Sequence, residues 1–283
     1  MIDVIVLGGG IVGASAALVL AQKGQRVALV ERDFCGSHSS GVNYGGVRRQ
    51  GRPLHQLPLS QRAHQLWADL PGLIGIEGEY VRCGHLKLAR SPGDFAALQA
   101  YADQTRGFGL GLQLLDRSEL RKRFPWVGDV AVGASLCPDD GHANPRLVSP
   151  AFARAAQRHG AAVYEQAEVI RIAHDSRLFQ VHCANGLHLQ APWLLNCAGA
   201  WAGKVAAQLG EPVPIISAHP AMLVTEPLRG VMTVSTGVEG GGIYAIVGGL
   251  SQMFGTAAQP VMPADADKLT AGKSIELAGI QFN

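Results

Sequence analysis

Three glycines near the N-terminus have the spacing of a nucleotide-binding turn. Gly8, Gly10 and Gly13 follow the apolar run 4–7 and open an alanine-rich stretch that Gly24 ends. In such a turn the first glycine permits a tight bend and the second lets the backbone approach a pyrophosphate. The third lets the helix pack on the sheet. The N–H groups at the helix start favour an anion by roughly 0.3 to 1 kcal/mol per charge. The spacing therefore predicts that a diphosphate binds here.

A carboxylate follows at the place where it could contact a ribose. Glu31 follows the second apolar run, 27–30. An acid at this position hydrogen-bonds ribose hydroxyls and repels a 2′-phosphate. NADP is therefore disfavoured, whereas NAD and the ADP half of FAD both remain open. The alternative is a glycine-rich turn without a ligand, but the order of strand, glycines, helix, strand and acid argues against it.

The composition narrows the class of protein. The 283 residues are enough for two domains, and a net charge of +2 with 16% charged residues argues against a nucleic-acid-binding protein. Five cysteines without a CxxC pair indicate a reduced, cytoplasmic setting. No histidines have metal-ligand spacing, so we expect no metal. Asp3 and the adjacent glycines argue against a leader or a membrane span, and peripheral membrane contact stays open.

Hydrophobic periodicity and capping signals predict the elements that position these residues. After the long turn-rich stretch 32–52, helices are predicted at 58–70, 91–106, 118–124 and 144–159. Strands are predicted at 84–89, 161–164, 178–184 and 187–191, the last two joined by Asn185-Gly186. The run 194–201 is predicted to be a buried strand that turns sharply into a helix ended by Gly210. The segments 221–225 and 231–235 are expected to form an antiparallel sheet, and 161–164 to rejoin the N-terminal sheet.

Several motifs occur together in one order. They are the glycine turn, Ser39 to Arg48, Gly84-His85-Leu86, Asp140 to Pro145, and Asn196 to Trp201. Over about residues 2–240 they resemble the FAD-dependent amine and amino-acid oxidoreductases of the D-amino-acid oxidase superfamily. The nearest groups are glycine oxidase, the sarcosine oxidase β-subunit and D-hydroxyproline dehydrogenase-like proteins. The resemblance implies that the dinucleotide is FAD.

The resemblance also implies a fold. It is α/β, and α+β overall, with a Rossmann-like FAD-binding domain and a discontinuous substrate domain built on an antiparallel sheet. The FAD-binding domain would comprise residues 1–80 and 141–215, and the substrate domain 81–140 and 216–245. Residues 246–283 would form an atypical C-terminal tail.

The resemblance further implies which residues contact FAD. They are Gly8, Gly10, Ile11, Val12, Gly13, Glu31, Arg32, Ser39, Ser40, Gly45, Gly46, Val169, Ala198, Gly199 and Trp201. The turn and Glu31 would hold the ADP half, and Arg32 would approach the adenosine. The serines and the glycines after them would follow the pyrophosphate and the flavin, while the backbone of Val169 would clamp the adenine.

The implied activity is oxidation of a small amine or amino acid by hydride transfer to the flavin. A carboxylate substrate needs a basic partner, and the guanidinium fork matches both carboxylate oxygens. Arg48 matches the family's loop arginine near the flavin ring, so it is the first candidate and Arg49 the second. Alternatively, one of the two forms a salt bridge. His38, His85 and His142 are expected to have no catalytic role, and Cys197 to pack as a small apolar residue.

Other functions stay open at this point. One is an FAD-dependent 2-hydroxy-acid or glycerol-3-phosphate oxidoreductase, and another is a non-catalytic FAD-binding protein or subunit that needs partner subunits or an electron carrier. From about Ala245 the sequence departs from the family pattern, and we expect a truncation or a shifted reading frame. Gly240-x-Gly242-x-x-Ala245 is not expected to be a second nucleotide site, because no capped helix follows it.

Overall fold

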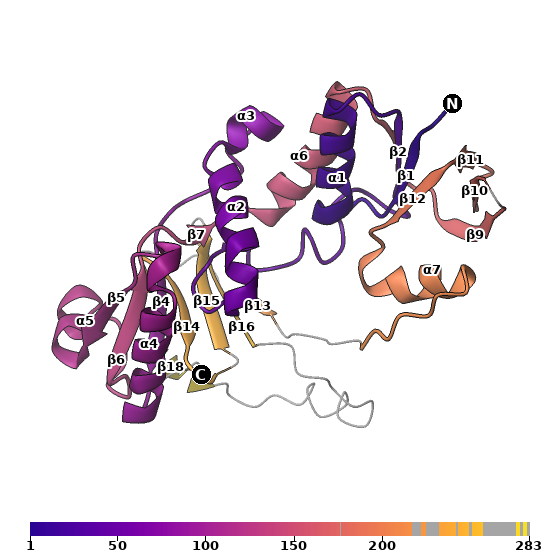
Figure 1. The fold of residues 1–283 in the computed structure, drawn as a ribbon. Helices are drawn as coiled ribbons and strands as arrows, with labels where there is room; N and C mark the ends of the chain where they lie inside the picture. Colours follow the sequence, from indigo (N-terminus) through magenta and orange to yellow (C-terminus); the bar gives the residue numbers. More distant parts are fainter. Residues whose placement is uncertain are drawn as a thin grey trace. The chain divides into compact units, whose positions relative to one another are not determined.

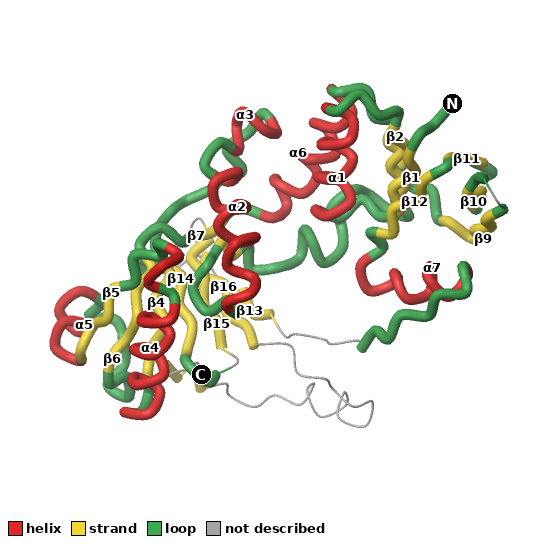
Figure 2. The backbone as a smooth tube through the Cα atoms, in the orientation of Figure 1, coloured by secondary structure: helices red, strands yellow, loops and turns green. Residues whose placement is uncertain are grey.

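The computed structural model describes residues 1–175, 177–216, 222–224, 232–241, 243–248, 251–256, 276–277 and 280–281. The chain divides into two compact units, each of which is described by itself. The first unit comprises residues 1–43, 69–78 and 144–217, and the second unit comprises 44–68, 79–143 and 218–283. Figure 1 labels most of their helices and strands, and Figure 2 colours them by type.

The first unit is built on a four-stranded parallel sheet with the strand order β12-β1-β2-β8. Its strands are β1 (Val4–Leu7), β2 (Val27–Val30), β8 (Ala162–Tyr164) and β12 (Trp193–Asn196). The central strands β1 and β2 are buried throughout, as is usual for parallel sheets. Leu7 is in register with Val30 and with Asn196. The carboxyl ends of these three strands therefore meet at one edge of the sheet.

Helices and a small second sheet pack around these strands. Helix α1 (Ile11–Gln22) lies beside α6 (Pro145–Arg158). A three-stranded antiparallel sheet, β9 (Val169–His174), β10 (Phe179–Cys183) and β11 (His188–Ala191), shares a core with alternate residues of β1 and β2. Burying each large apolar side chain there stabilises the unit by about 1.5 to 3 kcal/mol. The short helices α3 (Leu70–Ile74) and α7 (Ala202–Gln208) complete the unit.

The second unit contains a seven-stranded sheet with the order β13-β16-β15-β14-β4-β6-β5. The strands are β4 (His85–Ala89), β5 (Gln113–Asp116), β6 (Gly133–Cys137), β13 (Met222–Val224), β14 (Ser235–Val238), β15 (Ile243–Gly248) and β16 (Ser251–Thr256). Only β4 and β14 pair in parallel, and the other neighbours are antiparallel. This sheet provides the largest framework of the unit.

One side of that sheet forms the core of the second unit. Leu86 and Leu88 of β4 pack with Ala134 and Leu136 of β6 and with Leu120 of α5. The unit's helices are α2 (Leu57–Trp67), α4 (Pro92–Gln104) and α5 (Arg117–Arg123).

None of the helices in the described residues has the length and apolar content that a membrane crossing requires.

Short pairings complete the framework. Strand β3 (Gly46–Val47) pairs with β7 (Gly141–His142), and β17 (Glu276–Leu277) pairs with β18 (Ile280–Gln281). Three 3₁₀ turns lie at 54–56, 106–108 and 199–201. Because β3 and β7 pair, the residues that follow β3 lie beside those that precede β7.

The four predicted helices are present, with ends shifted by one to three residues. Ser91 and Asp94 form the capping box that starts α4, as the sequence indicated. The hairpin turns at Asn185-Gly186, where Gly186 has a φ of +87°. The segment 161–164 joins the N-terminal sheet as β8, so the expected helix-then-strand unit rejoins that sheet. The strand expected at the start of 194–201 is present as β12, but its side chains are mostly exposed rather than buried, because β12 is an edge strand.

The structure differs from several predictions for the C-terminal part of the chain. Residues 221, 225, 231 and 242 lie outside the described residues, and so do 257–275. Strands β13 and β14 belong to one sheet but are not neighbours, and β14 begins only at the last residue of the predicted segment 231–235. Strand β15 follows Gly240, so no helix begins there. Strands β15 and β16 continue the second sheet to Thr256, where a separate tail was expected.

The predicted domain boundaries differ from the two compact units in one large segment. Residues 44–68 belong to the second unit, whereas the sequence placed them in the FAD-binding domain. The assignment of functions to domains stays a prediction, because compactness alone does not identify a binding function.

Candidate functional site

The turn between β1 and α1 has no room for side chains. Gly8 has a φ of +102°, and a Cβ on it would lie 2.4 Å from the carbonyl oxygen of Cys197. A Cβ on Gly13 would lie 2.0 Å from the carbonyl oxygen of Gly8. Helix α1 and the residue after β12 therefore approach the turn as closely as a pyrophosphate-binding turn requires.

A serine from the long loop reaches the start of α1. The hydroxyl of Ser40 accepts the N–H of Ile11 at 2.9 Å, and a Cβ on Gly10 would lie 3.0 Å from the same oxygen. The hydroxyl of Ser149 donates to the carbonyl oxygen of Ser40 at 2.8 Å, which fixes the loop on α6. The loop thus delivers a hydroxyl to the helix N-terminus, where the helix dipole favours negative charge.

Glu31 is held in place by backbone N–H groups. Its side chain is buried, and its two oxygens accept from Gly9 at 2.7 Å and from Asp33 at 2.9 Å. A carboxylate has about four acceptor positions, so both oxygens keep capacity for ribose hydroxyls.

These residues surround a cavity of about 460 Å³ that lies wholly in the first unit. Small-molecule sites usually have volumes of about 300 to 1,000 Å³. The predicted contact residues that line it are Gly8, Gly10, Val12, Glu31, Arg32, Ser39, Ser40, Val169, Ala198, Gly199 and Trp201. The structure therefore brings together residues from three distant stretches of sequence around one cavity.

Four predicted contact residues are placed elsewhere. Ile11 and Gly13 belong to α1 and do not line the cavity, and Gly45 and Gly46 belong to the second unit. Their contact with FAD stays a prediction. The sequence reasoning missed other lining residues, among them Phe34, Lys204 and Gln208. Lys204 and Gln208 could have been found from their spacing of four residues, which puts both on one face of the helix after the 194–201 turn.

A polar and aromatic cluster lines part of the cavity. Asp33 accepts from His38 at 2.6 Å and from Arg32 at 3.1 Å, and these hydrogen bonds lower the pKa of Asp33, with His38 contributing most. The guanidinium carbon of Arg32 lies 4.3 Å from the ring centroid of Trp201. His38 is therefore bound to Asp33 and packs on Trp201 rather than being a free loop side chain, and the absence of a catalytic role stays a prediction.

Glu31, Asp33 and His38 place three potential metal-ligand atoms within 4.8 Å of one another. Each of these side chains already has protein partners, Glu31 through two N–H groups and Asp33 through two cations. The expectation that this chain binds no metal stays a prediction.

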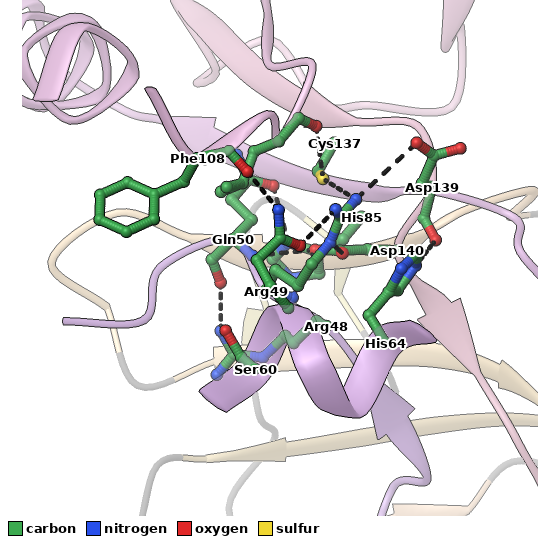
Figure 3. A network of polar contacts seen from close by, with 12 residues as sticks. Arg48, Arg49, Gln50, Ser60, His64, His85, Phe108, Cys137, Asp139 and Asp140 are labelled. Carbon is green, nitrogen blue, oxygen red and sulfur yellow. Dashed lines mark hydrogen bonds and ion pairs between the residues drawn. The ribbon is translucent and has the colours of Figure 1, made fainter. Parts of the chain in front are cut away.

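Arg49 lies in a buried network of the second unit. Its Nε is 3.2 Å from Asp140, whose side chain is fully buried, and its Nη1 donates to Gln61 at 2.8 Å. Asp140 also accepts the backbone N–H groups of Arg49 and Gln50, both at 2.9 Å. Figure 3 shows this network, including the contact of Arg49 with Cys137. Arg49 thus has the salt bridge that the sequence left as an alternative for one arginine of the pair.

Arg48 is placed differently. Its Nη1 donates to the carbonyl oxygen of Gln50 at 2.7 Å, and its guanidinium carbon lies 5.3 Å from the ring centroid of Tyr244. Its side chain is half-buried, and no carboxylate of the described residues forms an ion pair with it. Arg48 therefore keeps donors for an anion, and its role in binding substrate stays a prediction.

A buried histidine completes this region. Gln50 donates its amide N–H groups to the carbonyl oxygen and hydroxyl of Ser135, so its amide oxygen faces Nδ1 of His85 at 2.9 Å. This assigns the proton to Nδ1 of His85. Burial, and then the charges of Arg48 and Lys87, lower the pKa of His85 to about 3. His85 is therefore neutral at neutral pH.

The other singled-out residues have packing environments. Burial raises the pKa of the Cys197 thiol, which makes it a weaker nucleophile and agrees with its expected packing role. His142 contacts the sulfur of Cys83 through Nδ1 at 3.4 Å, and burial lowers its pKa. Both observations are consistent with structural roles.

Comparisons with known proteins place this arrangement in a family. The family model DAO, FAD dependent oxidoreductase, matches residues 3–276. The match runs past residue 245, so the family pattern extends further than the sequence motifs indicated. The chain is 31% identical over 216 residues to glycine oxidase from Geobacillus kaustophilus, which covers 74% of this chain and 57% of that protein.

One further relative and one solved structure are also similar to this chain. The chain is 29% identical over 244 residues to mitochondrial sarcosine dehydrogenase from Mus musculus, covering 82% of this chain and 26% of that protein. The crystal structure of glycine oxidase from Geobacillus kaustophilus superposes with a TM-score of 0.79 at 26% identity, covering 92% of this chain and 72% of that one. The chain thus spans about half of the first relative and a quarter of the second.

The closed turn yields a stability prediction. Gly13→Ala places a methyl group against the carbonyl oxygen of Gly8, so it is expected to destabilise the protein by at least about 2 kcal/mol. Urea unfolding measures this change. Gly107→Ala is the matched control, because no atom lies within 4 Å of its Cβ position and the expected change is under about 0.5 kcal/mol. Equal stability of the two variants would contradict the packing described for the turn.

The two neighbouring arginines are expected to differ in the same assay. Arg49→Gln leaves the buried carboxylate of Asp140 without its ion pair and is expected to cost about 3 to 5 kcal/mol. Arg48→Gln removes no ion pair of the described residues and is expected to cost less than about 1.5 kcal/mol. If Arg49→Gln were as stable as Arg48→Gln, the structural role assigned to Arg49 would be wrong.

Proposed function

This chain belongs to the DAO family of FAD-dependent oxidoreductases, and we propose that it binds FAD and oxidises a small amine or amino acid. The cavity of the first unit carries this proposal, because a side-chain-free turn, a helix N-terminus and a buried carboxylate converge on it. These are the three groups that a nucleotide diphosphate requires.

The residues of the cavity fit the ADP half of the cofactor. Glu31 would accept the hydroxyls of the ribose, and the N-terminus of α1 with Ser40 would face the diphosphate. The backbone at Val169 would border the adenine, and Ala198 and Gly199 would line the other side. Lys204 adds a positive charge to the lining of a site for a doubly charged diphosphate.

Bound FAD would supply the acceptor for a hydride from the substrate carbon, while the amine nitrogen releases a proton and the carbon–nitrogen bond becomes double. The contribution of the chain is to bind and orient the substrate. Arg48 would hold the substrate carboxylate through charge-assisted hydrogen bonds, each contributing about 1.5 to 3 kcal/mol. Arg49 would act by fixing the loop, through Asp140, rather than by contacting the substrate.

The relatives favour an amine or amino acid over the alternatives. Glycine oxidase, at 31% identity, and sarcosine dehydrogenase, at 29%, are named for amine substrates. L-2-hydroxyglutarate dehydrogenase from Escherichia coli, at 29% identity over 226 residues, keeps the 2-hydroxy acid as the second candidate, whereas glycerol 3-phosphate rests on the related fold alone. The chain spans only part of these relatives, so its activity is a proposal, and we propose that partner subunits or an electron carrier can take part in it. We further propose a cytoplasmic location, which the five unpaired cysteines support.

An anaerobic titration tests the proposed function. The purified chain, reconstituted with FAD, is mixed with a panel of small amines and amino acids and with a panel of 2-hydroxy acids and glycerol 3-phosphate. Bleaching of the visible flavin spectrum by a member of the first panel is the expected result. Bleaching only by the second panel would assign the hydroxyl reaction instead. Bound FAD that no compound reduces would make the chain a non-catalytic FAD-binding protein.

The role of Arg48 has its own kinetic test. Arg48→Gln is expected to raise KM for a carboxylate-bearing substrate by about 10- to 100-fold, because a charge-assisted contact is lost. Arg106→Gln serves as the control, since that side chain is exposed and pairs only with its neighbour Asp103. Unchanged kcat and KM in Arg48→Gln would exclude Arg48 from the substrate site.

A further inference from the structure

The side of the sheet opposite Leu86 and Leu88 carries a small apolar cluster at Cys137 and, beside it, a polar region around the buried His85, called the polar surface below. Leu86 and Leu88 point into the core, so the alternating residues His85 and Lys87 point to the other side. The strand register puts Gly237 beside Lys87, and Tyr244 opposite Gly237. This side of the sheet thus combines a neutral histidine, an ammonium group and an aromatic ring.

Two cations flank a glycine on this surface. A Cβ on Gly51 would lie 3.3 Å from Nη1 of Arg48 and 3.6 Å from Nζ of Lys87. The two nitrogens are therefore at most about 7 Å apart, a distance at which their charges repel each other. Gly51 has a φ of +75° and carries no side chain. Residue 51 therefore places no side-chain atom between the two cations.

A third cation follows directly in the sequence. Burial and the nearby charge of Arg48 lower the pKa of Arg52. Lys87 forms an ion pair with Glu239, but neither Arg48 nor Arg52 has an ion-pair partner in the part of the chain that the structure describes. Arg48 is half-buried and Arg52 is exposed, and the carboxylate of Asp140, whose charge acts on Arg52, is already paired with Arg49. An anionic ligand would relieve the mutual repulsion of the two guanidinium groups.

An unpartnered buried atom lies on the same surface. Nε2 of His85 has no hydrogen-bond partner among the described residues, and it lies 3.4 Å from the Cβ position of Gly237. With its proton on Nδ1, His85 presents an acceptor there. This acceptor is closed to solvent next to Gly237, so it is a buried polar atom beside the cations and not a contact for the acid groups.

We propose that this surface selects substrates with two acid groups. Arg48 holds the carboxylate next to the carbon–nitrogen bond, and Arg52 and Lys87 hold the second acid group. The substrate class is then an amino acid or N-substituted amino acid with an acidic side chain or substituent. This inference rests on the substrate-binding role of Arg48 in the proposed function.

A pair of non-reactive probes tests the selection without any redox step. Glutarate carries two carboxylates, and pentanoate is the same chain with one. Calorimetric titration of the FAD-reconstituted protein at fixed ionic strength is expected to show glutarate binding at least about tenfold more tightly, as one added charge-assisted contact provides. Glycerol 3-phosphate is the third probe, because a phosphate monoester is also doubly charged.

Variants on two separate segments localise the effect. Arg52→Gln and Lys87→Gln are each expected to weaken glutarate binding by about tenfold and pentanoate binding by less than about twofold. Arg48→Gln is expected to weaken both ligands. Arg106→Gln, on an exposed turn, is expected to change neither. Unfolding midpoints establish that each variant is folded. If either Arg52→Gln or Lys87→Gln fails to fold, the other variant still tests the proposal.

Several outcomes would overturn the proposal. They are equal affinity for glutarate and pentanoate, no binding of either, tighter binding of glycerol 3-phosphate than of glutarate, and a glutarate preference that persists in both Arg52→Gln and Lys87→Gln. Flavin reduction is measured separately, so failure of any amine to reduce the flavin would refute the proposed function while the binding data still judge this inference.

Discussion

The turn between β1 and α1 can close only because its glycines carry no side chains. Methyl groups at Gly8 or Gly13 would overlap backbone oxygens, and one at Gly9 would overlap the side chains of Cys35 and Glu31. Closure brings the N–H of Gly9 to the carboxylate of Glu31 and the N-terminus of α1 to the hydroxyl of Ser40. The cavity of the first unit exists because these groups converge. The proposed binding of a nucleotide therefore depends on this steric constraint.

The second unit depends on a different interaction, the burial of Asp140. This carboxylate must be compensated, and it takes the guanidinium of Arg49 and two backbone N–H groups. One arginine of the pair is thereby committed to the fold, and the other keeps its donors for a ligand. The same loop then holds Gln50 against Ser135, which sets the tautomer of His85.

The convergence of the predicted nucleotide-contact residues on one cavity follows from local rules, and their contact with FAD stays a prediction. Glycine spacing, Glu31 and the loop serines each have one physical task, and these residues meet at one cavity. The strands β5, β6, β15 and β16 were missed, because their segments lack strict alternation of apolar and polar residues. The roles of Arg48 and Arg49 could not be separated from sequence, since the distinction depends on Asp140, 91 residues away from Arg49 along the chain.

The central claim is that the cavity beside Glu31 binds the ADP half of FAD. Calorimetric titration of the purified chain with ADP and with its 2′-phosphorylated analogue tests it most directly. ADP is expected to bind, to compete with FAD, and to bind at least about tenfold more tightly than the analogue, because the carboxylate of Glu31 repels a 2′-phosphate. Equal affinity for the two nucleotides, or no competition between ADP and FAD, would contradict it.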